Sequence, residues 1–253
     1  MKLTKISKED FLEALYHETE AFLARIDSPE VFIVEKFYDG EEILNFRQQV
    51  FEKGTATDPS WHPLYDDCPD YHRIHDDYPK AHVKARMHAY YHHGWFEHNR
   101  EVFDRFREIF DMKNYLAGFE PGHFITNTPS QHQVARVNLQ NYPRGGGYIA
   151  EHIDPKSRFA RLQTLVQASQ IGVDYYSGGL FARETPKNDR FFVDEFTEIG
   201  DLMVLSPDIP HGLDPIDPEI ELDWNRSDGR WIILPLILNS DYPSEENVKP
   251  REI

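Results

Sequence analysis

The sequence has a single cysteine, Cys68, so no disulfide bond can form within the chain. It has no apolar run that approaches the roughly 20 residues of a membrane-spanning helix. Its first residues also lack the apolar stretch and cleavage pattern of a secretion signal. Disulfides persist mainly in oxidising compartments, so their absence suits a reducing one. We therefore expect a cytoplasmic protein that is not bound to a membrane.

Positive charge is also scarce, because 27 lysines and arginines face 44 acidic residues and the formal net charge is −17. Proteins that bind nucleic acids present basic surfaces, and so do proteins that bind anionic membranes. We therefore expect neither as a partner. The glycine patterns of phosphate-binding loops and dinucleotide-binding folds are missing, as is the serine elbow of hydrolases.

What is present is enough apolar sequence for one normal domain, at 40% hydrophobic residues. Residues 1–118 are expected to be mainly helical, with one short β-type run at 31–34. Within this part, residues 81–116 are expected to form helix. Residues 53–80 are rich in proline, aspartate and aromatic residues, and we expect them to form an irregular covering loop.

From about residue 119, short β-rich segments alternate with turn signals. These segments are RVNLQNY, GGYIAEHID, RLQTLVQAS, SGGLFARE, RFFVDEF, GDLMVLSP and RWIILPLIL. Such close spacing is typical of an antiparallel sandwich or barrel. The sequence thus predicts a single α+β domain, with a helical layer over 1–118, a β core over 119–240 and a tail over 241–253.

A pair of possible metal ligands lies in the segment His152-Ile153-Asp154. Alternate residues of a strand point to the same face, so the imidazole and the carboxylate converge. His211 follows a strand and a proline-rich turn, and is the best candidate for a third ligand. Two histidines and one carboxylate form the facial triad of non-haem iron(II) oxygenases, which leaves coordination positions open.

An arginine, Arg230, begins the strongly apolar run that closes the β-rich region. A buried arginine needs an anionic partner, and its guanidinium can bind a carboxylate through two hydrogen bonds. The alternative is an exposed strand end, or a pair with a protein carboxylate such as Asp228. Arg226 is the competing anion-binding residue, although no apolar strand follows it directly.

The ordered pattern from Tyr142 through glycines 145–147, the His152–Asp154 pair, His211 and Arg230 resembles the Fe(II)/2-oxoglutarate oxygenases. It is most similar to their prolyl-hydroxylase-like branch, and it covers about residues 119–240. The resemblance implies a double-stranded β-helix core, which is a jelly-roll or cupin-like architecture.

By the same resemblance, the triad of His152, Asp154 and His211 binds iron(II), and Arg230 binds the distal carboxylate of 2-oxoglutarate. Tyr142 falls where the family often places a residue that faces this cosubstrate. The side chain of Asn138 shares the strand face of Tyr142, so it is expected to line the same cavity. Gln167, on the next inward strand, is expected to reach the cosubstrate.

The activity implied is hydroxylation of a C–H bond in a small molecule, such as an amino acid or natural-product intermediate. Dioxygen is the oxidant, and succinate and CO2 are released. Two alternatives remain open from the sequence. One is another mononuclear metal enzyme on a β-barrel that does not use 2-oxoglutarate, and the other is a non-catalytic binding module.

Two further features are of interest. Histidines 82, 88, 92, 93 and 98 are expected to lie on a helical surface, and they do not form a zinc-binding sequence. Residues 53–80 and the stretch 214–228 are long and polar. They are expected to act as mobile covers over the site.

Overall fold

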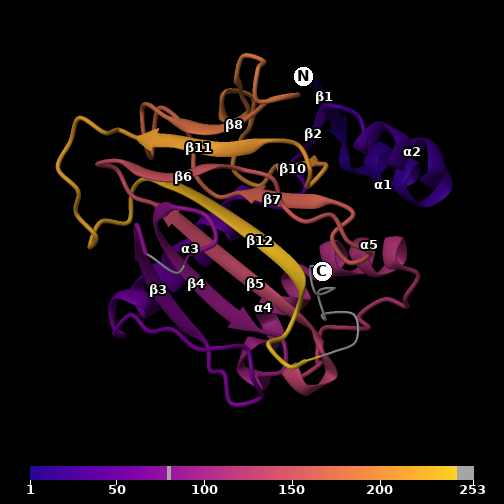
Figure 1. Ribbon diagram of the computed structural model, residues 1–253, viewed down its shortest axis with the longest axis horizontal. Helices are drawn as coiled ribbons and strands as arrows, with labels where there is room; N and C mark the ends of the chain where they lie inside the picture. Colours follow the sequence, from indigo (N-terminus) through magenta and orange to yellow (C-terminus); the bar gives the residue numbers. More distant parts are fainter. Residues whose placement is uncertain (79–80, 244–253) are drawn as a thin grey trace, which may run out of the picture.

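The computed structural model of the chain describes residues 1–78 and 81–243 (Figure 1). Its strands are β1 (Lys2–Ser7), β2 (Glu30–Glu35), β3 (Tyr71–Asp76), β4 (Ala85–His93), β5 (Gln133–Tyr142), β6 (Gly147–His152), β7 (Gln163–Gln167), β8 (Gly179–Ala182), β9 (Phe191–Phe192), β10 (Leu202–Leu205), β11 (His211–Ile216) and β12 (Arg230–Asn239). Its helices are α1 (Lys8–His17), α2 (Thr19–Ile26), α3 (Gly40–Thr55), α4 (Arg100–Arg105) and α5 (Arg107–Ala117), with short 3-10 helices η1 (Glu97–Asn99), η2 (Pro129–Gln131) and η3 (Asp194–Phe196).

The strands of the described residues join in one sheet, in the order β1-β2-β10-β7-β12-β5-β4-β6-β11-β8-β9, with β3 beside β4. The sheet bends between β4 and β6, so that β6, β11 and β8 form a smaller layer facing the larger layer that contains β12, β5 and β7 (Figure 1). It does not close into a barrel. Two facing layers of mainly antiparallel strands form the expected double-stranded β-helix.

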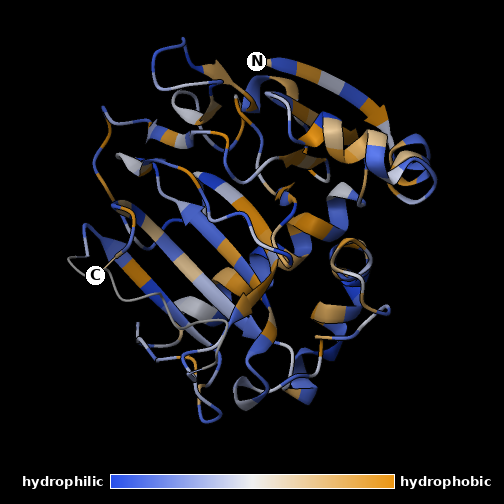
Figure 2. Cartoon of the chain, turned by 45° about the vertical axis from the view of Figure 1, so that its right-hand side comes forward, coloured by the Kyte–Doolittle hydropathy of each residue, from blue (hydrophilic) through white to orange (hydrophobic). Residues whose placement is uncertain are grey.

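The alternation of side chains along the larger layer creates two separate apolar regions. On β5, Val137 and Leu139 are buried against the helices together with Phe106 and Phe110. The residues between them on β5 face the smaller layer. Figure 2 shows the mixture of hydrophobic and hydrophilic positions along these strands. The period of two therefore separates the helix-covered core from an interior between the layers, where polar side chains of β5 lie beside the second apolar cluster.

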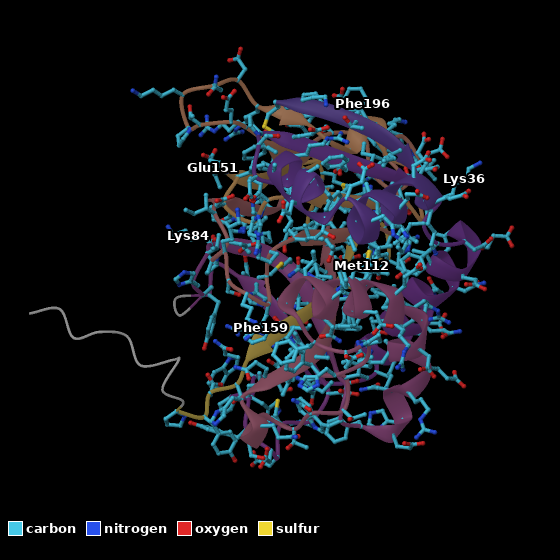
Figure 3. All side chains as sticks on the ribbon, turned by 90° about the vertical axis from the view of Figure 1, so that its right-hand side faces the viewer. Lys36, Lys84, Met112, Glu151, Phe159 and Phe196 are labelled. Atoms are coloured by element: carbon cyan, nitrogen blue, oxygen red, sulfur yellow. The ribbon has the colours of Figure 1, made fainter. Side chains whose placement is uncertain are left out.

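Helices α1 to α5 supply much of the helix-side core. The Ser7 hydroxyl caps α1 by accepting a hydrogen bond from the backbone of Asp10, and Asp39 caps α3 in the same way. Met112 of α5 lies in the interior in Figure 3, whereas Lys84 and Glu151 lie at an edge. No helix in the described part of the chain is both long enough and apolar enough to cross a bilayer.

The prediction of helix over residues 81–116 is wrong for its first part, because 85–93 form strand β4. This strand is buried on both faces, so its sequence ARMHAYYHH lacks the polar–apolar alternation that marks a half-buried strand. The N-terminal part also contributes β1, β2 and β3 to the same sheet. The division into a helical part over 1–118 and a β core over 119–240 is therefore not a division in space. Residues 244–253 of the predicted tail lie outside the described residues.

Candidate active site

Three possible metal ligands meet at one end of β6. The ligand atoms of His152, Asp154 and His211 all lie within 4.8 Å of one another. The Nε2 atoms of His152 and His211 are 3.7 and 3.6 Å from the Asp154 carboxylate oxygens. Two atoms that are each about 2 Å from a shared ion lie at most about 4 Å apart, so the spacing suits a bound metal.

The pairing of β6 with β11 brings the two histidines together. His211 lies directly opposite His152 in this antiparallel pair, and their ring centroids are 4.4 Å apart. Their approach therefore follows from the pairing of two neighbouring strands. Asp154 is held beside them because its backbone N–H donates to the carbonyl of Pro207, at 2.8 Å, in the segment that leads to His211.

Hydrogen bonds to the backbone determine which ring nitrogen of each histidine faces the metal site. Nδ1 of His152 and Nδ1 of His211 each lie 2.8 Å from a backbone carbonyl, that of Ala150 and that of Ile209. Since a carbonyl only accepts, both Nδ1 atoms must carry the proton, which leaves Nε2 free to bind a metal. Burial, followed by the neighbouring His211, lowers the pKa of His152 and so favours its neutral form.

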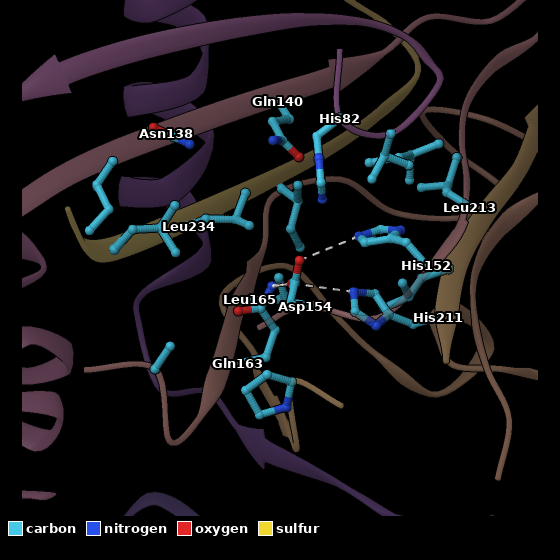
Figure 4. Close-up of a pocket in the computed structure, with 18 of the residues that line it drawn as sticks. His82, Asn138, Gln140, His152, Asp154, Gln163, Leu165, His211, Leu213 and Leu234 are labelled. Atoms are coloured by element: carbon cyan, nitrogen blue, oxygen red, sulfur yellow. Dashed lines mark hydrogen bonds and ion pairs between the residues drawn. The ribbon is translucent and has the colours of Figure 1, made fainter. Parts of the chain in front are cut away.

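The carboxylate of Asp154 is also prepared for metal binding. Burial by itself raises its pKa, but the hydrogen bond and charge of His211 and the charge of His152 lower it overall. The side-chain amide of Gln163 donates to Oδ2 of Asp154 at 2.8 Å. Figure 4 shows the amide of Gln163 beside this carboxylate, on the side away from His152. The donor set is therefore two imidazole Nε2 atoms and one oriented carboxylate, which matches a facial triad.

The triad opens into a cavity of about 510 Å³ between the two layers of the sheet. Figure 4 shows Asn138 and Leu234 on the wall opposite His152 and His211. A volume of this size is typical of sites for small molecules. Among the residues predicted from the sequence, the cavity wall includes Tyr142, Asn138, His152, Asp154, His211 and Arg230.

Arg230 is buried and paired. Its Nε and one Nη nitrogen donate to the two carboxylate oxygens of Asp194, at 2.8 and 2.9 Å. Asp194 also accepts hydrogen bonds from the Tyr175 hydroxyl, at 2.7 Å, and from the backbone of Leu180, at 2.9 Å. Burial opposes the charge of Arg230, but Asp194 raises its pKa well above the usual value. The protein partner is thus Asp194 of η3, and not Asp228 as the sequence alternative proposed.

Comparisons with known proteins bear on the fold. No protein-family model matches the sequence, and a search of curated proteins finds no match. Among solved structures, a Pseudomonas putida prolyl-4-hydroxylase is similar at 11% identity and a TM-score of 0.50, covering 86% of this chain and 97% of its own. A prolyl hydroxylase from Trichoplax adhaerens, in complex with a hypoxia inducible factor oxygen degradation domain peptide fragment, has 15% identity, coverages of 92% and 94% and a TM-score of 0.51.

A third similar structure is that of JOX2 in complex with 2OG, Fe and JA. It has 13% identity and a TM-score of 0.52, and it covers 98% of this chain and 79% of its own. The fold is that of the Fe(II)/2-oxoglutarate oxygenases. Identities this low establish the fold alone, and the chemistry has to be argued from the residues of the site.

Within this oxygenase fold, two sequence-based assignments are corrected. Gln167 does not belong to the cavity wall, because its amide donates to the carbonyl of Ser169 at 2.8 Å and its side chain is fully buried. Gln163, four residues earlier on β7, does line the cavity. Arg226, the competitor of Arg230, is a surface residue paired with Asp228.

The sequence did not indicate two other residues. Asp194 lies in a turn after β9, and no local pattern links it to Arg230, 36 positions away. His82 lies on the cavity wall just before β4, whereas His88, His92 and His93 are buried in β4 itself. The pattern of histidines therefore reflects a buried strand, one residue at the cavity and, for His98, the short helix η1, and not one shared helical surface.

Proposed function

We propose that this protein is an Fe(II)- and 2-oxoglutarate-dependent oxygenase that hydroxylates a C–H bond of a small molecule and releases succinate and CO2. The observation that carries the proposal is the convergence of His152, Asp154 and His211 on a cavity that Arg230 also lines. Iron(II) with 2-oxoglutarate supplies the activation of dioxygen needed to oxidise an unactivated C–H bond.

The residues around the triad have distinct tasks in this proposal. His152, Asp154 and His211 hold the iron through Nε2, a carboxylate oxygen and Nε2. Gln163 keeps the Asp154 carboxylate turned toward the metal through its hydrogen bond. The carbonyls behind the two imidazoles prevent the rings from turning. Three protein ligands leave room at the metal for a chelating cosubstrate and for dioxygen.

Arg230 is proposed to bind the distal carboxylate of 2-oxoglutarate. Asp194 accepts from Nε and from one Nη nitrogen, and the Tyr175 hydroxyl also interacts with the guanidinium. Asp194 thereby fixes the direction of the guanidinium without using all its donors. The ring of Tyr142 lies 6.0 Å from the guanidinium carbon, and its hydroxyl donates to Oε1 of Gln140 at 2.8 Å. When 2-oxoglutarate binds, this hydroxyl is proposed to turn from Gln140 and donate to the same carboxylate.

Asn138 has a part in this proposal as well. Its side-chain oxygen is buried at the cavity and has no hydrogen-bond partner among the described residues. A buried polar atom without a partner is costly, so a ligand or a water molecule is expected to satisfy it. We assign Asn138 to the side of the cavity where cosubstrate and substrate meet.

The test is reconstitution of the purified protein with Fe(II) in the absence of oxygen, followed by addition of 2-oxoglutarate and air. We expect succinate to form in proportion to dioxygen consumed, even without substrate, although slowly. His152→Ala and Asp154→Ala should abolish this turnover and weaken iron binding. His17→Ala removes an exposed histidine of α1 and should leave both unchanged.

Two outcomes would contradict the proposal. A protein that binds iron but forms no succinate would support the alternative of another metal enzyme on this fold. A protein that binds no iron under anaerobic conditions would support a non-catalytic binding module. Measuring iron binding and succinate separately therefore distinguishes the three functions.

A further inference from the structure

One wall of the cavity consists of two neighbouring strands with different chemistry. The inward residues of β5 are polar, and they are Arg136, Asn138, Gln140 and Tyr142. Their partners on β12 are mostly apolar, and they are Leu236, Leu234, Ile232 and Arg230, in that order. Leu238 extends the apolar column beyond Leu236. A ligand along this wall would meet polar groups on one side and aliphatic groups on the other.

Arg136 is a cation at the cavity for which the structure provides no anion. It makes no ion pair with any residue of 1–78 or 81–243, and its buried Nε has no hydrogen-bond partner there. Its guanidinium carbon lies 4.7 Å from the centroid of the Tyr91 ring. Arg230, at the other end of the same two strands, in contrast forms an ion pair with Asp194.

A half-buried guanidinium without an acceptor is energetically unfavourable, because it loses water contacts that no protein group replaces. The ring of Tyr91 compensates for part of this loss and holds the guanidinium in a defined direction. The net charge of the protein is −17, so the carboxylates of the chain outnumber its lysines and arginines. The absence of one here points to an anion that comes from outside the chain.

This anion is distinct from 2-oxoglutarate. In the β5–β12 pair, Arg136 is opposite Leu236, and Arg230 is opposite Tyr142. The two arginines are therefore six strand positions apart, which corresponds to about 20 Å along the strands. The five carbons of 2-oxoglutarate span at most about 6 Å. Tyr91 holds one guanidinium at its own end and Asp194 holds the other. A cosubstrate bound between Arg230 and the triad therefore leaves Arg136 for a second ligand.

We propose that Arg136 binds the carboxylate of the substrate, and that the substrate is a monocarboxylic acid with a largely apolar skeleton. This inference rests on the proposed function, since it takes the triad as the reactive end of the cavity. One guanidinium balances one negative charge, which matches a carboxylate better than a phosphate dianion. Leu234, Leu236 and Leu238 contact the skeleton, and Asn138 lies between Arg136 and Gln140 to bind a polar substituent.

The experiment uses octanoate and its neutral analogue octanamide as probes. Binding of each is measured by calorimetry to the full chain loaded with Fe(II) and saturating 2-oxoglutarate without oxygen, so that Arg230 is already occupied. We expect octanoate to bind at least about tenfold more tightly than octanamide. In Arg136→Met the affinity for octanoate should fall at least about tenfold, while that for octanamide stays within about twofold.

Arg100→Met is the matched control, because Arg100 is an exposed arginine paired with Glu97 far from the cavity wall. It should bind both probes as the unchanged protein does, which excludes a general effect of net charge. Arg136→Lys should recover part of the octanoate affinity because it retains the positive charge. An equal loss of both probes in Arg136→Met, no preference for the acid, or tighter binding of octyl phosphate than of octanoate would overturn the proposal.

These outcomes separate this inference from the proposed function. Iron binding and succinate formation without substrate are measured on the unchanged protein and on the Arg100→Met control, so this test of the oxygenase assignment does not depend on Arg136. If the protein binds octanoate through Arg136 but forms no succinate, the oxygenase assignment fails and the acid-binding site stands. If succinate forms but Arg136→Met binds octanoate normally, the acid-binding site fails and the oxygenase assignment stands.

Discussion

At the scale of single residues, the triad depends on groups that do not bind metal. Each imidazole is oriented by a carbonyl two residues before it in the chain, and Gln163 orients Asp154. Such supporting contacts set the geometry and basicity of metal ligands. Arg230 is oriented in the same way by Asp194. Substitutions in this pair can therefore distinguish an effect on 2-oxoglutarate binding from an effect on the stability of the fold.

The first residue-scale prediction concerns Arg230→Met. The change should raise the 2-oxoglutarate concentration needed for half-maximal succinate formation at least about tenfold and leave iron binding nearly unchanged, because Arg230 is not a metal ligand. It also leaves Asp194 buried without its partner, so the free energy of unfolding should fall by about 3–5 kcal/mol. Both are measured, by turnover at varied 2-oxoglutarate and by urea unfolding.

A second change distinguishes the two effects. Asp194→Asn added to Arg230→Met removes the unpaired charge, while its side-chain oxygen can still accept from Tyr175 and Leu180. The double variant should recover part of the lost stability but none of the lost affinity for 2-oxoglutarate. Recovery of affinity together with stability would show that Arg230 has a structural role only.

At the scale of elements, one strand pair creates the site and another holds the edge of the sheet. Pairing of β6 with β11 places His152 opposite His211. The turn before β6 needs Gly145 and Gly146, whose φ angles of +91° and +99° are unfavourable for other residues. At the far edge, β1 runs parallel to β2, and Glu30 at the start of β2 accepts three hydrogen bonds from neighbouring elements.

Glu30 gives a prediction about pH. Burial by itself raises its pKa, but hydrogen bonds from Arg25, Thr4 and Lys2 lower it to about 2. A carboxyl group with a lowered pKa in the folded state stabilises the fold above its ordinary pKa, near 4.5. That stabilisation is lost as the pH falls from about 4.5 toward about 2. Glu30→Gln should therefore cost about 2 kcal/mol of unfolding free energy at pH 7, and much less at pH 3.

The measurement is urea unfolding of both proteins at pH 7 and pH 3. Glu35→Gln serves as the control, because Glu35 ends the same strand, is exposed, and pairs with Lys5 at 3.6 Å. That change should alter stability by less than about 1 kcal/mol at either pH. A cost of Glu30→Gln that is equal at pH 7 and pH 3 would mean that ionisation of Glu30 does not stabilise β1 and β2.

At the scale of the whole molecule, the described part of the cavity wall comes from other segments than the predicted covers. Neither 53–78 nor 214–228 supplies a residue of the cavity wall. The second of these is also attached to the sheet, since the ring of Trp224 lies 5.1 Å from that of His88. The wall instead includes His82 from the connection before β4, with Pro155 and Ala160 from the connection after β6.

These connections are expected to respond to ligands. Hydrogen exchange of the iron-loaded protein should show added protection in residues 81–84 and 155–160 when 2-oxoglutarate binds without oxygen, because these residues border the cavity. Residues 53–60, which lie away from the wall, provide the comparison and should not change. Protection confined to 53–78 and 214–228 would instead favour the covers predicted from the sequence.

The sequence by itself determined the triad and the fold class. The i, i+2 spacing of His152 and Asp154 forces both side chains onto one face of a strand, and the apolar run after Arg230 marks a buried strand. The same parity argument placed Asn138 on the strand face of Tyr142, and both side chains line the cavity. Each of these inferences depends only on neighbouring residues of one strand. It would therefore hold in any fold that contains these strands.

Only the tertiary structure decided which residues surround the triad. The pairing of Asp194 with Arg230 joins residues 36 positions apart, and the contact of Gln163 with Asp154 depends on how β7 packs beneath β6. Strand β4 is buried on both faces, so its alternation is hidden in the sequence. The lack of an anion beside Arg136 could likewise be seen only once the whole cavity was assembled, because a missing partner is a property of the packed molecule and not of any segment of it.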